Sequence, residues 1–212
     1  MHRLKRTANQ TCTITFDPDG SAHVRTGPQV GRLGETLKIF LVRHGDADAE
    51  VPEGLGDDAR ALTSKARTAL VNHFASLTDR MQGVGLILCS PLVRTVQTAQ
   101  LLSLIQKCDG PLKAHRSLLP DMPVGSIETV VSEHAGANLV LVGHQPSIGA
   151  MAAHFLGLQS FPKQVNPGTV IGLEIVENLA KESAALSDTP ATMAAQLIFY
   201  AAPGHPLLED LN

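Results

Sequence analysis

The chain has 212 residues, of which 43% are hydrophobic and 17% charged, so it can bury a core of ordinary size and falls within the range of a single domain. Its net charge at pH 7 is −3, with no run of lysine or arginine, which removes the electrostatic basis for general binding to nucleic acid. No apolar stretch reaches the roughly 20 residues of a membrane span, and no apolar signal segment follows the basic start. We expect a cytoplasmic protein that binds neither nucleic acid nor membranes.

The first 36 residues form a polar, glycine-rich segment that differs in composition from the rest of the chain. Polar and apolar residues alternate over 13–16, and the turn-forming sequence Asp17-Pro18-Asp19-Gly20 follows. This pattern predicts a hairpin or a loose arm. We assign no chemistry to residues 1–36 and expect the main domain to span 37–212.

From residue 37 onward, short apolar runs alternate with longer segments of helical periodicity, which is typical of an α/β layer fold. Strands are predicted at 37–42, 86–89, 139–142, 170–176 and 196–201. Helices are predicted at 63–77, from 90 to about 105, near 124–134 and from 146 to about 156. We therefore expect a three-layer sandwich with a mainly parallel central sheet flanked by helices. The segment 179–194, rich in alanine, serine and threonine, stays unassigned.

Two of the helices have recognisable first residues. Thr63 stands directly before a helical pattern and is a preferred N-cap residue. Ser90 is a second N-cap type, and Pro91 after it suits the first helical position. The sequence therefore predicts helix starts at both places.

Three polar groups stand where predicted strands end: Arg43-His44-Gly45, Ser90-Pro91-Leu92-Val93-Arg94, and Gly143-His144-Gln145-Pro146. In open α/β sheets, the carboxyl ends of the strands and the neighbouring helix N-termini form the ligand crevice. We therefore expect these three groups to converge.

Arg94 falls in the first turn of its predicted helix, where a cation opposes the helix dipole. A phosphate at that position would meet backbone N–H groups as well as the guanidinium, whose planar fork suits phosphate oxygens. Arg43 supplies a second fork beside His44. The alternative for either arginine alone is a surface salt bridge, but their joint placement favours a phosphate pocket.

His44 could be an ordinary hydrogen-bonded structural histidine. Two nearby arginines would instead disfavour the imidazolium form and keep the ring neutral, leaving one nitrogen able to attack phosphorus. Gly45 would let the backbone turn and bring a carbonyl to the other ring nitrogen. His144 would donate to a phosphoryl oxygen and stabilise charge in the transition state.

Residues 41–45 (LVRHG), 90–99 (SPLVRTVQTA) and 142–146 (VGHQP) closely resemble the histidine phosphatase (phosphoglycerate mutase-like) superfamily, in the family's order. An RHG triplet alone is a weak signal, whereas all three motifs at strand ends are a strong one. The resemblance covers about residues 37–201. The short chain, Asp46-Ala47 and residues 60–63 (RALT) look most like the compact SixA-type protein phosphohistidine phosphatases. By that resemblance Arg60 is a further phosphate-pocket residue, with a solvated arginine before the helix as the alternative.

The resemblance implies a ping-pong reaction in which His44 becomes a phosphohistidine and water then releases phosphate, without a metal or other cofactor. In the phosphomonoesterase branch a carboxylic acid protonates the alkoxide leaving group, and Asp121 in LLPDMP is the candidate here. The alternative is an ordinary turn aspartate. Imidazole leaves readily from a phosphoramidate without such an acid, so a site in which Asp121 is only a turn residue favours P–N over P–O substrates.

The remaining polar residues give weaker signals. Asp46 and Asp48 are more simply hydrogen-bond partners of the arginines or loop residues than metal ligands. The three cysteines are widely spaced and indicate neither a disulfide framework nor a metal site. Gln97 and Thr98 follow Arg94 by three and four residues and are expected to steady its side chain.

We predict a metal-independent phosphohydrolase whose partner is a phosphohistidine-bearing protein. The first alternative is the same mechanism on a small phosphate ester, such as a sugar or nucleotide phosphate. A noncatalytic phosphate-binding module and a metallophosphatase are further alternatives.

Overall fold

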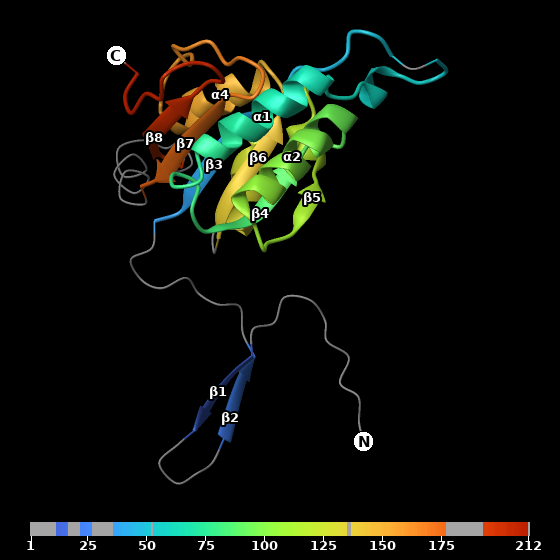
Figure 1. The fold of residues 1–212 in the computed structure, drawn as a ribbon. Coiled ribbons are helices and arrows are strands. Elements are labelled where there is room, and N and C mark those ends of the chain that lie inside the picture. The colour runs from blue at the N-terminus through green and yellow to red at the C-terminus, as the bar shows by residue number, and fades with distance from the viewer. Residues whose placement is uncertain are drawn as a thin grey trace, which may run out of the picture. The chain divides into compact units, whose positions relative to one another are not determined.

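The computed structural model describes residues 12–16, 22–26, 36–51, 53–134, 137–176 and 193–211, and the chain divides into two compact units, Met1–Glu35 and Thr36–Asn212. In the first unit the described residues form two strands, β1 (Cys12–Phe16) and β2 (Ala22–Thr26), which pair antiparallel (Figure 1). The rest of the predicted N-terminal arm and most of the segment 179–194 lie outside the described residues.

A six-stranded sheet forms the centre of the second unit, in the order β5-β4-β6-β3-β7-β8 (Figure 1). Its strands are β3 (Lys38–Arg43), β4 (Val84–Cys89), β5 (Leu112–Ala114), β6 (Asn138–Gly143), β7 (Val170–Ile175) and β8 (Ala195–Ala201). The pairs β5–β4, β4–β6 and β6–β3 are parallel, whereas β3–β7 and β7–β8 are antiparallel. The mainly parallel sheet expected from the sequence is therefore confirmed.

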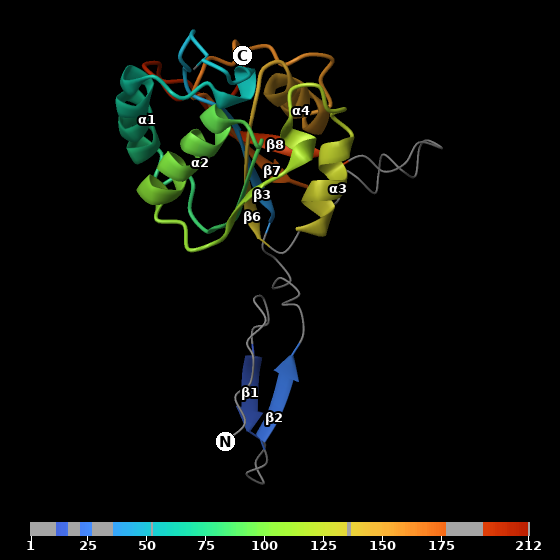
Figure 2. The same cartoon turned by 90° about the vertical axis from the view of Figure 1, so that its right-hand side faces the viewer.

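The central strands are apolar on both faces because helices cover both. In β3, Ile39 and Leu41 belong to one buried cluster and Phe40 and Val42 to the other, as the alternation of side chains along a strand requires. The covering helices are α1 (Ser64–Ser76), α2 (Val93–Gln106), α3 (Ser126–Glu133) and α4 (Ser147–Phe155). Figure 2 shows α1 and α2 on one side of the sheet and α3 and α4 on the other. The three-layer arrangement is thus as expected.

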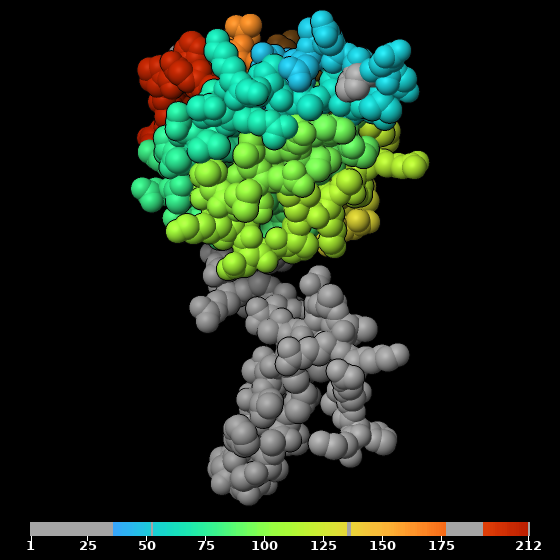
Figure 3. Space-filling model, turned by 45° about the vertical axis from the view of Figure 1, so that its right-hand side comes forward, coloured from blue at the N-terminus to red at the C-terminus, as the bar shows by residue number. Residues whose placement is uncertain are grey.

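In the space-filling view, α1 and α2 lie side by side on one face of the unit (Figure 3). They bury Leu70 and Phe74 from α1 and Ala99 and Leu102 from α2 against the same face. None of the helices in the described part of the chain is long and apolar enough to cross a membrane.

One of the two predicted helix starts is correct and the other is wrong. Thr63 caps α1, because its Oγ1 accepts a hydrogen bond from the Ala66 N–H over 3.0 Å. Ser90 does not cap α2, which begins at Val93 with Leu92 as its N-cap and without a side-chain capping bond. The Ser90 hydroxyl is engaged elsewhere, at the end of β6, and this contact belongs to the site described next.

Candidate active site

The end of β3 and the end of β6 lie next to each other and carry the two histidines of the predicted site. The two strands pair in parallel with Arg43 opposite Gly143, and the His44 N–H donates to the Gly143 carbonyl over 3.0 Å. His44 follows Arg43 and His144 follows Gly143, so the register places both imidazoles just beyond the same end of the two strands. Their ring centroids are 5.0 Å apart, with an angle of 62° between the planes. Strand pairing therefore brings together two side chains that are 100 positions apart in the sequence.

His44 is held as a neutral imidazole. Burial lowers its pKa to about 4, with the positive charges of Arg94, Arg43 and Arg60 acting in the same direction and the Gly45 hydrogen bond opposing them. Its Nδ1 lies 2.7 Å from the Gly45 carbonyl oxygen. A carbonyl can only accept, so the ring proton is on Nδ1 and the lone pair is on Nε2. This is the form of imidazole that can act as a nucleophile.

His144 is almost completely buried and also neutral. Burial lowers its pKa to about 3, helped by His44, Arg94 and Arg43 and opposed by the carboxylate of Asp57. Its Nε2 lies 2.9 Å from Oγ of Ser90. The same hydroxyl accepts from the N–H of Leu92 over 3.5 Å, and Leu92 directly precedes α2. No local pattern predicts the contact with His144.

Gly45 fits a closely packed position. A Cβ atom at this position would lie 2.5 Å from Cδ1 of Leu70 and 3.2 Å from Cδ2 of Leu62. The Gly45 N–H donates to Oγ1 of Thr98 over 3.1 Å, and the same hydroxyl donates to the Arg94 carbonyl over 2.7 Å. Thr98 therefore ties the turn after β3 to the first turn of α2.

The expectation that Gln97 and Thr98 would steady the Arg94 side chain is wrong. Thr98 bonds main-chain atoms, and Oε1 of Gln97 accepts from the Leu62 N–H over 2.8 Å. Side chains on a helix tilt toward its N-terminus. The Arg94 guanidinium therefore lies over the turn that precedes it, away from residues three and four positions later.

Arg94 is buried and Arg43 is half-buried, and part of the donor set of each guanidinium has no hydrogen-bond partner among the described residues. Nη1 of Arg43 donates to the Val165 carbonyl over 2.7 Å, and burial lowers the pKa of this guanidinium, opposed by Asp46. Arg94 is only 5% exposed. Nε of each arginine is buried without a hydrogen-bond partner in the described part of the chain. A buried donor without an acceptor costs about 1–3 kcal/mol, which an oxyanion between these groups would relieve.

Arg60 and Asp57 join this cluster from the 3-10 turn η1 (Asp57–Ala59). Nε of Arg60 donates to Oδ1 of Asp57 over 2.7 Å, and its Nη1 donates to the Asp48 carbonyl over 3.1 Å. Arg94 donates from Nη2 to Oδ2 of Asp57 over 3.0 Å and from Nη1 to the Asp57 carbonyl over 2.9 Å. Sequence reasoning missed Asp57. The available signal was its position three residues before Arg60, which is too common a spacing to single it out.

Asp121 lies on an exposed turn after the 3-10 turn η2 (Arg116–Leu118). The described residues give its carboxylate no hydrogen bond or ion pair. The preceding carbonyl, that of Pro120, accepts from Oγ of Ser147 over 2.8 Å at the start of α4. The structure therefore fixes the chain beside Asp121 without bringing its carboxylate into contact with the imidazoles, and its role as a general acid stays a prediction.

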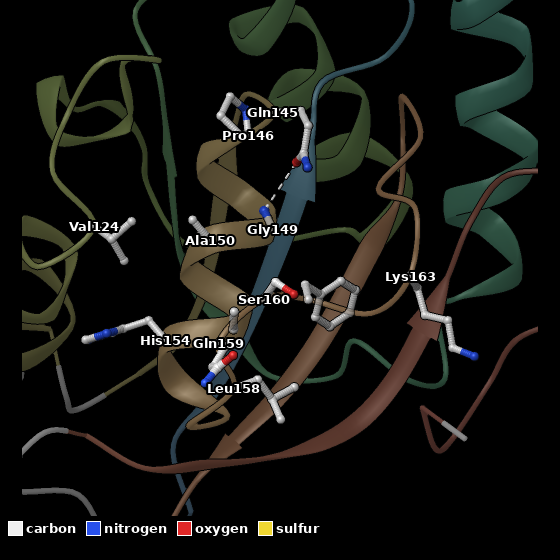
Figure 4. Close-up of a pocket in the computed structure, with 12 residues that line it drawn as sticks. Val124, Gln145, Pro146, Gly149, Ala150, His154, Leu158, Gln159, Ser160 and Lys163 are labelled. Atoms are coloured by element: carbon white, nitrogen blue, oxygen red, sulfur yellow. Dashed lines mark hydrogen bonds between the residues drawn. The ribbon is translucent and has the colours of Figure 1, made fainter.

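A cavity of about 490 Å³ runs along α4 (Figure 4). Gln145 and Pro146, which follow His144, line one end, and His154 and Leu158 line the other. Neither of the two paired imidazoles belongs to its lining. Among the described residues, no group of three or more histidine, cysteine, aspartate or glutamate side chains is placed to hold a metal ion.

The chain is similar to known proteins in sequence and in fold. The family model for the histidine phosphatase superfamily (branch 1) matches residues 39–118. A protein of Picosynechococcus sp. described only as uncharacterized is 34% identical over 125 residues, which cover 55% of this chain and 71% of that protein.

Solved structures share the fold at low identity. The protein histidine phosphatase SixA complexed with tungstate matches with a TM-score of 0.64 and 17% identity, covering 79% of this chain and 97% of that one. The SixA protein of Agrobacterium tumefaciens matches with a TM-score of 0.63 and 19% identity, covering 79% and 98%. A mycobacterial glucosyl-3-phosphoglycerate phosphatase in complex with VO3 matches with a TM-score of 0.52 and 18% identity, covering 76% and 97%.

Proposed function

This chain belongs to the histidine phosphatase superfamily and is a phosphatase, and on that premise we propose that it hydrolyses phosphohistidine on a protein, with His44 as the nucleophile. The observation that carries the proposal is the state of His44. Its ring is neutral, its proton is committed to the Gly45 carbonyl, and its Nε2 lone pair is available. Buried guanidinium donors without acceptors, on Arg43 and Arg94, stand in the same cluster.

The reaction has two steps. Nε2 of His44 attacks phosphorus as the P–N bond to the substrate imidazole breaks, and the bonding electron pair stays with that imidazole. Its other nitrogen is protonated, so it leaves as a neutral ring. Water then attacks the phosphorus of phospho-His44, releases inorganic phosphate and returns the lone pair to Nε2.

Arg43, Arg94 and His144 stabilise the charge on the phosphoryl oxygens in both steps. The arginines bind these oxygens through planar N–H donors. When the Ser90 hydroxyl donates to Nε2 of His144, the ring carries its proton on Nδ1, which then donates to a phosphoryl oxygen. Arg60 adds positive charge at the edge of the pocket.

Two observations favour a phosphohistidine substrate over a phosphate ester. Asp121, the acid candidate, is exposed and makes no hydrogen bond to another described residue, so the described contacts do not hold its carboxyl in place to protonate an alkoxide, whereas imidazole leaves without an acid. The SixA structures also match with higher TM-scores than the glucosyl-3-phosphoglycerate phosphatase, 0.63 and 0.64 against 0.52. We assign the whole reaction to the domain 37–212 and none of it to residues 1–36.

The substrate assignment is tested by comparing kcat/KM for a phosphohistidine-bearing protein domain with kcat/KM for small phosphate esters. We expect the phosphoprotein to be the better substrate. The reverse ranking would identify a small-molecule phosphatase, and Asp121→Asn would then show whether that residue is the acid, by losing ester hydrolysis alone.

The nucleophile is tested by trapping acid-labile phosphate on the enzyme and mapping the labelled residue. We expect label on His44, none on a His44→Gln variant, and unchanged labelling in a His205→Gln variant, because His205 is an exposed histidine of the same domain. Turnover that survives in the His44→Gln variant would rule out the covalent mechanism.

A further inference from the structure

The Asp57 carboxylate is exposed, yet it bonds the most deeply buried cation of the site. The Asp57 side chain is 60% exposed, whereas the side chain of Arg94 is 6% exposed. Its two carboxylate oxygens are divided between two cations, with Oδ2 on Arg94 and Oδ1 on Arg60. Hydrogen bonding to Arg60 and the charge of Arg94 lower the pKa of this carboxyl, which keeps it ionised.

The atoms used by Arg94 determine which part of its guanidinium remains for a ligand. A guanidinium has two forked edges, one formed by Nη1 and Nη2 at its end and one formed by Nε and Nη2 along its side. Asp57 takes the end edge, through its carbonyl on Nη1 and its carboxylate on Nη2. The side edge contains Nε, which is buried and without a hydrogen-bond partner in the described part of the chain.

We propose that Asp57 is a positioning residue, which fixes Arg94 by its end edge so that the side edge, with Nε and the second N–H of Nη2, meets a phosphoryl oxygen pair. The inference rests on the proposed function, since it takes the phosphoryl group as the ligand of Arg94. Asp57 itself touches no reacting atom and acts through the arginine. Because the Arg94 guanidinium is already held in place before substrate binds, less conformational entropy is lost on binding.

The same carboxylate couples Arg60 to Arg94. Arg60 is held from its other end by the Asp48 carbonyl, so Asp57 lies between two cations that both lower the pKa of His44. Without the carboxylate, the two guanidinium groups would repel each other and lose a shared acceptor. Asp57 therefore sets the distance between two cations as well as the orientation of one.

The test measures binding of inorganic phosphate by calorimetry, which requires no turnover. For Asp57→Ala we expect a Kd for phosphate about tenfold higher than in the unchanged protein and a similar fall in kcat/KM. Asp57→Asn keeps an acceptor oxygen and is expected to show about a threefold effect. Asp58→Ala is the matched control, because it removes the same charge from the same turn, and its Kd should change less than about twofold.

A double-mutant cycle with Arg94→Ala separates positioning from a general effect on folding. If Asp57 acts through Arg94, adding Asp57→Ala to Arg94→Ala should change the phosphate Kd by less than about twofold. Equal effects in both backgrounds would overturn the proposal. So would phosphate binding to Asp57→Ala that is as tight as, or tighter than, binding to the unchanged protein, since the carboxylate would then compete with the ligand.

These outcomes are distinct from failure of the proposed function. A His44→Gln variant that retains turnover would refute the nucleophile while leaving the Asp57 effect on phosphate binding unchanged. Loss of the Asp57 effect, in a protein that still forms phospho-His44, would refute only the positioning role.

Discussion

The two halves of the sheet contribute to the site in different ways. The parallel half, β5-β4-β6-β3, ends in side chains to which we assign the chemistry, including His44 and His144. The antiparallel half contributes backbone groups through the segment that enters β7. The Arg43 N–H donates to the Thr169 carbonyl over 3.0 Å, and Nη1 of Arg43 donates to the Val165 carbonyl over 2.7 Å.

Side-chain contributions to the site and backbone contributions to it respond differently to substitution. A side chain at the end of a parallel strand can be changed by one substitution, and the chemistry changes with it. A backbone carbonyl survives most substitutions at its own position, so the antiparallel half is sensitive only to changes that move the main chain. We therefore expect substitutions in the parallel half to have the larger effects on activity.

The largest effect in this set is expected for His144→Gln. The variant removes an imidazole donor from a buried site, and loss of one such donor reduces kcat by about 10²–10³-fold. Steady-state kinetics on the phosphoprotein would measure it. A loss smaller than tenfold would mean that His144 is not in contact with the phosphoryl group in the transition state.

The next effect concerns stability and pH. The ordinary histidine pKa is 6.5, and in the folded protein the pKa of His44 is about 4 and that of His144 about 3. Between these values the unfolded chain binds more protons, so the free energy of unfolding falls as pH decreases from about 6.5 to 4, by on the order of 5 kcal/mol for the two rings together. Chemical denaturation across this range would measure the slope. The double variant His44→Gln/His144→Gln should flatten it, and an unchanged slope would contradict burial as neutral rings.

A smaller effect is expected for Ser90→Ala. The substitution removes the hydroxyl that bonds Nε2 of His144 and leaves the ring without a fixed tautomer. We expect kcat to fall by about tenfold with KM little changed. Ser90→Thr keeps a hydroxyl and should recover most of the activity, so equal losses in both variants would point to packing instead.

The smallest effect is expected in the antiparallel half, for Tyr200→Phe in β8. The phenol of Tyr200 donates to the Gln164 carbonyl over 2.6 Å and steadies the segment that carries the Val165 carbonyl. Losing this bond should cost about 1 kcal/mol of unfolding free energy and change kcat less than about twofold. Denaturation and kinetics on the same variant would check both. A loss of kcat as large as that of Ser90→Ala would remove the distinction between the two halves.

The strand ends and helices of the fold could be predicted because each carries a local pattern. The central strands are short apolar runs, and Arg43, His44, Arg94 and His144 follow from motifs placed at their ends. The edge strand β5 was missed, because it has three residues, Leu112–Ala114, and an exposed Lys113 at its centre.

The site residues that could not be predicted make hydrogen bonds to residues distant in the sequence or act through backbone atoms. Asp57 contacts Arg94 across 37 positions, in a loop whose path no local pattern specifies. The Val165 carbonyl leaves no trace in the sequence, since every residue has one. The neighbours of Ser90 predict a helix cap, whereas its hydroxyl bonds a histidine 54 positions away.

The pairing of Arg43 with Gly143 has a consequence for how relatives of this chain are recognised. Deleting or inserting one residue within β3 or β6 would shift one histidine by about 3.3 Å along its strand and turn alternate side chains to the opposite face. Such a chain would retain every residue of its sequence motifs, but the imidazole corresponding to His44 would no longer lie beside the one corresponding to His144. The number of residues from the start of each strand to its histidine is therefore a better criterion for an intact enzyme than the presence of the motifs alone.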